Sequence, residues 1–416
     1  MKYGLTLTLT LVSGSGRMLM SSIFWMLLSY PITVVLTFLS TVVLSAIVHL
    51  KSLFRPKECL PRLYFKESSL AQHVLTRCLS LRRPLRLPFW SQNAHVQTVL
   101  GLMSREPTTT EFFREYVQMP DDGVIAIDWA PGAKYLCKRN PIVIVIPGLI
   151  GNATGVAQVC HEAISNGYRA CVFNRRGYGD SFLTTPTLQS YGDPSDLRSV
   201  VNFMKDRYTN SPIAVVGVGA GADLLLSYLG QFGSSSRLIA GVCVSPSYDS
   251  EDTFVNQIPK LYEKSYLMHI QSILGRYSKS FSSVIDLKAA LNAKSLKDLD
   301  RHVHCPLSGC SDLEEYWENN SPMRDVDDIC VPVLCFNSLD DPISVKRNIP
   351  YDIFKSYLNF FLVTTERGGH CGFVEGATGT SWTVKPAVEF ITAMLEFPTK
   401  VPEPYVKNGF HSVFAR

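Results

Sequence analysis

The sequence has little net charge, no short-period repeat and no closely paired cysteines. Its 416 residues include 40 basic and 36 acidic side chains, and the formal charge of +4 gives no reason to expect nucleic acid as a partner. The absence of a glycine period and of a recurring block of about 20 to 50 residues excludes collagen-like and repeat architectures. The 11 cysteines are scattered between Cys59 and Cys371, which favours reduced, buried thiols over a disulfide framework.

The apolar content is high enough to exclude disorder. Hydrophobic residues make up 46% of the chain and charged residues 18%. The length allows two average domains, and it allows one large α/β domain with an anchor equally well.

A long uncharged stretch lies near the N-terminus. No residue from Met18 to Val48 is charged. About 20 apolar residues, each rising about 1.5 Å in a helix, cross a bilayer core of about 30 Å. We therefore predict a transmembrane helix over residues 18–50, after an N-terminal tail at 1–17. A signal sequence, cleaved or uncleaved, remains the alternative, although its apolar core is normally about 7 to 15 residues long.

The orientation of this anchor follows from the flanking charges. Basic residues follow the apolar stretch at Lys51, Arg55, Lys57, Arg62 and Lys66, whereas Lys2 and Arg17 precede it. The positive-inside rule then predicts a cytoplasmic C-terminal domain. Glycosylation at the Asn319-Asn320-Ser321 sequon would instead indicate a lumenal or secreted domain.

Proline-rich and basic sequence separates the anchor from the rest. We interpret residues 51–105, which include Arg82-Arg83-Pro84 and Phe89-Trp90, as a basic connector and N-terminal arm. The arm either lies along lipid headgroups or packs on the following domain, and we favour packing. The domain is expected at 106–398 and is followed by a tail at 399–416.

From residue 112 onward the pattern is that of an α/β protein. The apolar segments 112–119 and 124–129, separated by Asp121-Asp122-Gly123, predict a hairpin. The β-branched run at 142–146 predicts a central parallel strand. Strands and helices then alternate, which predicts a mostly parallel, doubly wound sheet. Residues 246–325 break this rhythm and are expected to form a helical lid. Further strands are expected at 169–173, 213–216, 238–244, 331–336 and 359–364, and helices at 155–166, 193–207, 222–229 and 385–395.

An acid and a histidine follow two successive late strands. Asp341 lies after the strand at 331–336 and His370 after the strand at 359–364. An acid followed by a histidine, each on a loop after a strand, is the order found in the α/β-hydrolase fold, and the pair would act as a charge relay. The non-catalytic alternatives are that Asp341 belongs to a simple turn, that His370 is a core histidine, or that the two residues form a buried structural pair.

The expected nucleophile is missing from its turn. Val216 to Gly221 form a strand-turn-helix sequence in which Gly217 and Gly221 occupy the flanking positions of the Gly-x-Ser-x-Gly motif. The central position is Gly219, which has no nucleophilic side chain. Glycine relieves the strain of such a turn, so the replacement is structurally favourable and leaves the nucleophile position vacant.

Other nucleophiles and other sites remain weaker hypotheses. Cys371 adjoins His370, but neighbours at the end of a strand usually point apart. Ser227 lies too far along its helix, and nothing in the sequence directs Ser181 or Ser245 into the site. The glycine spacing does not match a dinucleotide loop. We therefore expect no cofactor and no metal, since the set His302, His304, Cys305 and Cys310 fits no standard zinc spacing.

The loop after the first central strand is the expected oxyanion loop. It contains Gly148, Leu149, Ile150, Gly151 and Asn152. The backbone N–H groups of Leu149 and Ala220 would be the donors of the oxyanion hole.

The ordered combination of these motifs resembles the membrane-anchored α/β-hydrolase-domain family related to bacterial YheT-type hydrolases. The resemblance covers roughly residues 85–398. The matching stretches are Pro88-Phe89-Trp90, Asn93, His95-Val96-Gln97-Thr98, Pro147-Gly148-Leu149, Asn174 to Gly179, Leu224 to Gly230, Arg324-Asp325-Val326, Pro332 to Cys335 and Gly369 to Phe373.

The resemblance implies an N-terminal membrane segment and, in most members, esterase or lipase activity on acylglycerols or phospholipids. It assigns the charge relay to Asp341 and His370 and the missing serine to Gly219. One branch is linked with the regulation of lipolysis through a partner phosphodiesterase. Two hypotheses follow: a membrane-tethered pseudo-hydrolase that binds membrane lipid, an ester ligand or a protein partner, or an active ester hydrolase with a non-standard nucleophile.

Overall fold

The computed structural model describes residues 40–41, 43–45, 56–103, 111–376 and 379–397. The chain divides into two units, Met1–Pro56 and Lys57–Arg416. In the first unit, residues 40, 41 and 43–45 are helical, and the remainder of the predicted membrane segment lies outside the described residues, as do the tails 1–17 and 399–416. Among the residues that are described, no helix has the length and apolar character needed to cross a bilayer.

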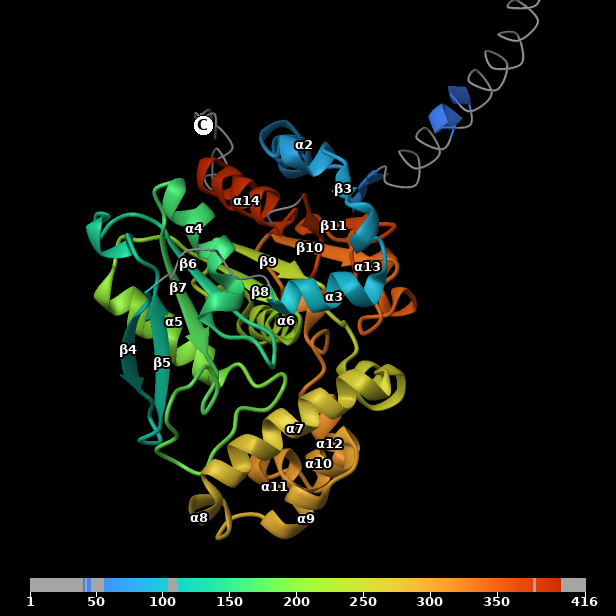
Figure 1. Cartoon of the computed structure of the whole chain (residues 1–416). Coiled ribbons are helices and arrows are strands. Elements are labelled where there is room, and N and C mark those ends of the chain that lie inside the picture. The colour runs from blue at the N-terminus through green and yellow to red at the C-terminus, as the bar shows by residue number, and fades with distance from the viewer. Residues whose placement is uncertain (1–39, 42, 46–55, 104–110, 377–378, 398–416) are drawn as a thin grey trace, which may run out of the picture. The chain divides into compact units, whose positions relative to one another are not determined.

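The second unit is built around a 9-stranded sheet with the order β2-β11-β10-β9-β8-β6-β7-β5-β4 (Figure 1). Strands β6 to β11 pair in parallel, whereas β2, β5 and β4 at the two edges pair antiparallel. The predicted fold class, a mostly parallel doubly wound sheet, is therefore confirmed. The strands are β2 (Arg62–Phe65), β4 (Phe113–Gln118), β5 (Val124–Trp129), β6 (Ile142–Ile146), β7 (Arg169–Asn174), β8 (Ile213–Val218), β9 (Ala240–Val244), β10 (Val333–Ser338) and β11 (Phe360–Thr365).

Helices cover both faces of this sheet because the central strands are apolar on both sides. All residues of β6 are buried, and they alternate between two cores. Val143 and Val145 pack with α4 (Ala157–Ser165) and α14 (Val384–Glu396). Ile142, Ile144 and Ile146 pack with α5 (Ser195–Arg207), α6 (Ala220–Phe232) and α13 (Tyr351–Ser356).

Residues 57–103 pack on the domain and contribute to its sheet. Strand β2 extends the main sheet beside β11, and β1 (Lys57–Cys59) pairs with β3 (Leu85–Leu87). Helix α2 (Ser69–Arg77) adds Ala71 and Val74 to the same core as α14. Helix α3 (Ala94–Met103) follows the 3-10 turns η1 (Leu79–Arg82) and η2 (Phe89–Ser91).

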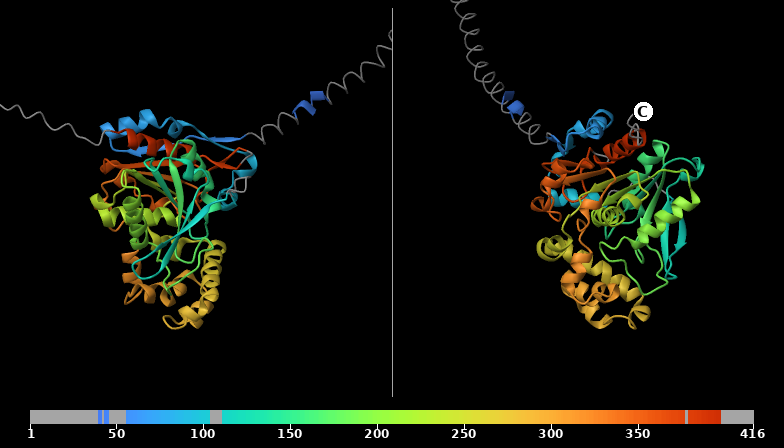
Figure 2. Two further views of the ribbon diagram at one scale, coloured as in Figure 1. Left: turned by 90° about the vertical axis from the view of Figure 1, so that its left-hand side faces the viewer. Right: turned by 180° about the vertical axis from the view of Figure 1, so that it is seen from behind.

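The predicted insertion is helical and forms one group of helices at one end of the domain (Figure 2). Its apolar residues share a core with Leu149, which lies in the loop after β6, and with Ala220, the first residue of α6. Trp317 stacks on Tyr191 with ring centroids 5.3 Å apart, which fixes the insertion to the loop after β7. The helices are η6 (Asp252–Gln257), α7 (Lys260–Arg276), α8 (Ser278–Phe281), α9 (Leu287–Asn292), α10 (Leu296–His302), α11 (His304–Ser308) and α12 (Leu313–Asn319).

The structure differs from the predicted elements mainly at their ends. Helix α6 begins at Ala220, two residues earlier than expected, because Gly219 turns the chain directly from β8 into the helix. Helix α5 begins at Ser195, two residues later than expected, and Asp193 accepts a hydrogen bond from the N–H of Ser195 at 2.9 Å.

Candidate active site

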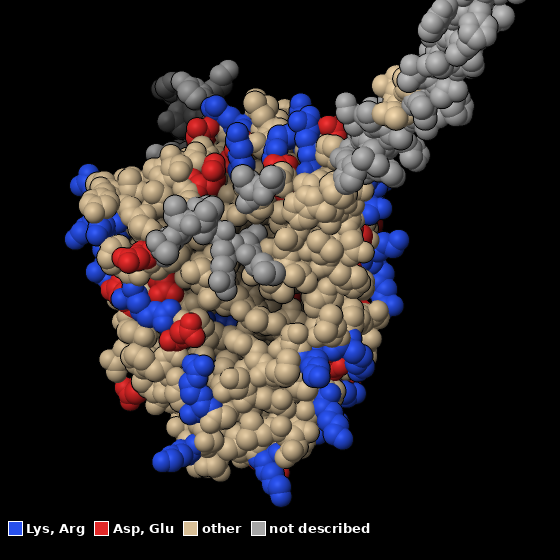
Figure 3. Space-filling view, in the orientation of Figure 1, with Lys and Arg blue, Asp and Glu red and all other residues tan. Residues whose placement is uncertain are grey.

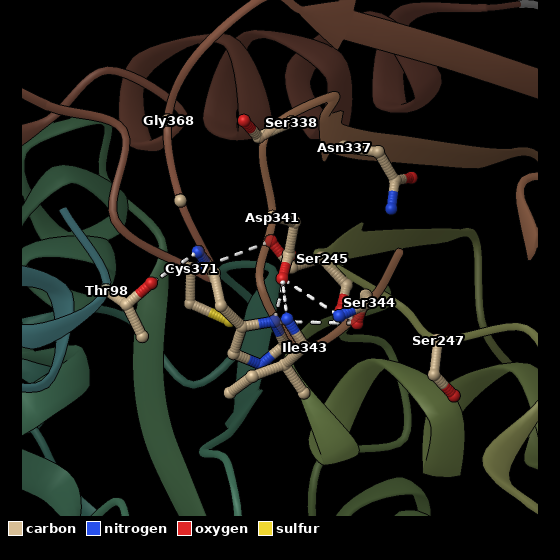
Figure 4. Close-up of polar contacts among 12 residues, drawn as sticks. Thr98, Ser245, Ser247, Asn337, Ser338, Asp341, Ile343, Ser344, Gly368 and Cys371 are labelled. Atoms are coloured by element: carbon tan, nitrogen blue, oxygen red, sulfur yellow. Dashed lines mark hydrogen bonds and ion pairs between the residues drawn. The ribbon is translucent and has the colours of Figure 1, made fainter. Parts of the chain in front are cut away.

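Asp341 and His370 lie together beyond the carboxyl ends of β10 and β11. Nδ1 of His370 is 2.9 Å from Oδ2 of Asp341. The other carboxylate oxygen accepts from the N–H groups of Ile343 at 2.7 Å and Ser344 at 2.8 Å (Figure 4). The carboxylate side chain is completely buried, so these contacts fix its orientation. Such a pair holds the imidazole in one tautomer and leaves Nε2 facing the site.

Two further contacts place the loop that carries His370. Oδ1 of Asp340 accepts from the N–H groups of Gly368 and Gly369, each at 3.0 Å. The N–H of His370 itself donates to Oγ1 of Thr98 on α3 at 2.9 Å. Asp340 therefore holds the loop, while the adjacent Asp341 orients the imidazole. Thr98 is a positioning residue, although it was not predicted from the sequence as a site residue.

The electrostatic environment of His370 favours its charged form. Burial lowers the pKa of His370, but the nearby charges of Asp341 and Cys371 and the hydrogen bonds to both side chains raise it well above its ordinary value. These surroundings therefore stabilise the imidazolium that forms when Nε2 takes up a proton.

The turn between β8 and α6 has the backbone of a nucleophile elbow. Gly219 has φ 55° and ψ −123°, a conformation that side chains rarely adopt. A Cβ on Gly217 would lie 2.4 Å from the carbonyl oxygen of Gly221, and a Cβ on Gly221 would lie 2.2 Å from that of Ile146. The backbone is therefore packed too closely at both flanking glycines to admit a side chain.

Cys371 lies beside the vacant nucleophile position. A Cβ built on Gly219 would be 3.1 Å from Nε2 of His370 and 3.4 Å from Sγ of Cys371. The expectation that Cys371 and His370 point apart is wrong, because residue 371 lies in a turn and not on a strand. Residue 371 has φ +58°, and its Sγ approaches the same Cβ position of residue 219 as Nε2 of His370.

The serines considered as substitutes are engaged elsewhere. Oγ of Ser227 accepts from Arg324 at 3.0 Å, and Oγ of Ser181 donates to the carbonyl of Tyr178 at 2.7 Å. Ser245 is nearer, but its Oγ accepts from the N–H of Cys371 at 3.0 Å. Ser245 therefore supports the Cys371 backbone.

A cavity of about 270 Å³ opens beside these groups. Its walls include the predicted oxyanion residues Leu149 and Ala220, together with Gly219, His370 and Cys371. Tyr266 of α7 also lines it, and burial raises the pKa of this phenol to about 12, so it stays neutral. This volume lies just below the usual range of about 300 to 1,000 Å³ for small-molecule sites.

The insertion's histidines and cysteines do not come together around a common centre. Nδ1 of His304 is 2.7 Å from Asp300, and Sγ of Cys305 points to the backbone carbonyl of Asp312 at 3.2 Å. In the described part of the chain, no group of three or more side chains is arranged to hold a metal ion.

Comparison with known proteins agrees with this geometry. The model of the alpha/beta hydrolase fold matches residues 141–377. Human protein ABHD15 is 34% identical over 80% of this chain and 74% of its own length. Mouse phospholipase ABHD3 and mouse monoacylglycerol lipase ABHD2 are each 28% identical, over 81% of this chain and 85% and 86% of their own lengths. This chain belongs to the α/β-hydrolase family.

Proposed function

We propose that this protein binds an acyl-bearing lipid in its hydrolase cavity without serine-hydrolase chemistry, and has a regulatory or scaffolding role in lipid metabolism. The observation that carries the proposal is the combination of a buried Asp341–His370 pair with Gly219 at the elbow. Loss of the nucleophile costs a serine hydrolase about 10⁶-fold in kcat, while the binding groups remain. Binding therefore survives where serine catalysis does not.

The ligand class follows from the walls of the cavity and from the relatives. Leu149, Val159, Val218 and Val244 give the cavity an apolar wall, and His370 offers a polar group at one side. Relatives bear the names phospholipase and monoacylglycerol lipase, which both act on acyl esters of glycerol. An ester or fatty acyl group combines the apolar and polar parts that these walls would accept.

We further propose that the domain turns α3 toward a lipid surface. Val96, Val99 and Leu102 recur on one side of α3 and are 38%, 45% and 54% exposed. Leu102 also lines the cavity, so the exposed apolar side of α3 continues into the proposed ligand site. Few charged side chains lie over this part of the surface (Figure 3). The same proposal includes a membrane anchor in residues 18–50. It also includes a protein partner in lipolysis, for which a phosphodiesterase is the candidate.

A fluorophosphonate probe for serine nucleophiles tests the loss of serine chemistry. The probe should not label the wild-type site, because Gly219 has no side chain that could react. The wild-type chain should hydrolyse aryl esters slowly. Gly219→Ser should gain labelling at the new serine and raise ester hydrolysis by at least about 10²-fold, because Asp341 orients His370 and the proposed oxyanion donors Leu149 and Ala220 line the same cavity. A Cβ at residue 219 is close to His370 and Cys371, so the gain should increase when Cys371→Ala provides space.

The matched control is Gly219→Ser combined with His370→Gln, which should lose both gains. Strong labelling of a serine in the wild-type chain would contradict the proposal. A folded Gly219→Ser variant that remains inactive, with and without Cys371→Ala, would show that the site is not assembled for acyl chemistry.

A further inference from the structure

A thiol and an imidazole meet at the point where Gly219 leaves space, and a carboxylate contacts the far nitrogen of the imidazole. The Cβ position of residue 219 is within 3.4 Å of Sγ of Cys371 and 3.1 Å of Nε2 of His370. Nδ1 of the same imidazole is bonded to Asp341 at 2.9 Å. A nucleophile beside a base that a third group orients is the arrangement that activates serine and cysteine nucleophiles.

The backbone holds the thiol in this place. Cys371 has φ +58°, a backbone conformation that is uncommon and strained for a residue with a side chain. Such a conformation persists only when its surroundings fix it. Here the N–H of Cys371 donates to Ser245 at 3.0 Å, and the preceding N–H donates to Thr98 at 2.9 Å. Asp341, Ser344 and Cys371 lie close together in this site (Figure 4).

Cys371 differs from the core cysteines in its surroundings. Burial raises the pKa of Cys78 and Cys160 to about 12, which keeps those thiols protonated and inert. Cys371 instead lines the cavity and neighbours an imidazole whose pKa is raised. Reactive cysteines occur in partly accessible positions next to a histidine of this kind. Cys137 and Cys330 are exposed and provide matched controls.

We propose that Cys371 is the nucleophile of this site and accepts an acyl group from a carboxylic ester or thioester bound in the cavity. The inference rests on the proposed function, since the acyl group must first occupy the same cavity. Sγ attacks the carbonyl carbon and forms a carbon–sulfur bond, while its proton passes to Nε2 of His370. The N–H groups of Leu149 and Ala220 stabilise the oxyanion.

The bond between the carbonyl carbon and the leaving oxygen or sulfur then breaks. His370 returns the proton to this leaving group, so the products are S-acyl Cys371 and a free alcohol or thiol. The cavity wall contributed by Tyr266 and Leu102 would surround the acyl chain.

p-Nitrophenyl octanoate tests this step in the whole chain. We expect a burst of about one equivalent of p-nitrophenol and an octanoyl group that peptide mapping by mass spectrometry locates on Cys371. Neutral hydroxylamine should remove the group, as it does a thioester. Cys371→Ala and Cys371→Gly should abolish the burst, and glycine tolerates φ +58°, so the second variant keeps the turn intact.

Further variants test whether Cys371 reacts as an activated nucleophile or only because it is accessible. His370→Gln should slow acylation by about 10²–10⁴-fold, the usual contribution of a general base. Cys137→Ala and Cys330→Ala should leave the burst unchanged. An octanoyl group located elsewhere, or acylation of Cys371 at the same rate in His370→Gln, would overturn the inference.

Binding is measured separately by displacement of a fluorescent fatty acid with octanoate. Displacement without any acylation would overturn the role of Cys371 and leave the proposed function standing. If neither displacement nor acylation were observed, the proposed function would be contradicted as well.

Discussion

The backbone at Gly219 keeps the conformation of a nucleophile elbow although the residue has no side chain. Its φ of 55° and ψ of −123° follow from the tight passage between β8 and α6. The packing at Gly217 and Gly221 holds this passage independently of the central residue. A change of one residue can therefore remove serine chemistry while the loops around it stay in place.

Asp223 lies on the first turn of α6 and is a second titratable group near the elbow. Its two carboxylate oxygens accept from the N–H and the hydroxyl of Ser247, each at 2.8 Å. Burial nevertheless raises the pKa of Asp223 to about 6, because the hydrogen bonds from Ser247 and the charge of His370 offset only part of the desolvation.

This raised pKa predicts a pH dependence of stability with a definite sign. Between about pH 4, where an unfolded aspartate titrates, and about pH 6, the folded state holds a proton that the unfolded state has lost. The free energy of unfolding should therefore fall as the pH rises through this window, by at most about 3 kcal/mol at this residue.

Asp223→Asn should remove this dependence. Urea unfolding at several values between pH 4 and pH 7 should show the wild-type chain losing stability relative to the variant. Asp206→Asn, at an exposed carboxylate on α5, is the control and should follow the wild-type curve. Parallel curves for wild type and Asp223→Asn would contradict the assignment.

At the scale of elements, α3 connects the cavity to the surface. Thr98 on α3 accepts a hydrogen bond from the backbone of His370, whereas Leu102 is exposed and also lines the cavity. One helix thus contributes to the position of the proposed base and to the wall of the cavity.

The exposed side of α3 leads to a prediction about lipid binding. In a chain that begins at Lys57, Val99→Asp and Leu102→Asp should each weaken co-sedimentation with phosphatidylcholine vesicles by about tenfold or more, because each removes apolar contact area and adds a charge. Leu358→Asp, at a 50% exposed leucine outside α3, is the matched control and should have little effect. Equal losses in all three variants would argue against α3 as the contact.

At the scale of the whole molecule, the N-terminal arm completes the sheet. Arg62–Phe65 form β2, and Leu63 and Phe65 stand opposite Val363 and Phe361 of β11. Without β2, the backbone groups of β11 would form an open edge, which promotes association between chains.

Two truncations test this role of the arm. A chain that begins at Lys57 should unfold cooperatively, since residues from 57 onward form a compact unit. A chain that begins at Glu67 lacks both β1 and β2 and should have a lower melting temperature and aggregate on heating, as measured by calorimetry and light scattering. Identical melting of the two chains would mean that β2 contributes little to stability.

The sequence predicted the sheet well where periodicity is strong. The run at 142–146 is fully buried, and the hairpin around Asp121-Asp122-Gly123 forms as β4 and β5. The edge strand β2 was not predicted, because a segment of four residues in a basic, proline-rich region has no distinct period. Its strand conformation comes from pairing with β11.

The sequence by itself determined the fold class, the order of acid and histidine, and the vacancy at Gly219, because each depends on local periodicity or on residue type. Only the tertiary structure decided that Cys371 faces that vacancy, since its direction depends on the left-handed backbone at residue 371 and on hydrogen bonds from segments far apart in the chain. The sequence specifies the chemical group of each side chain, but long-range packing determines where in space that group lies.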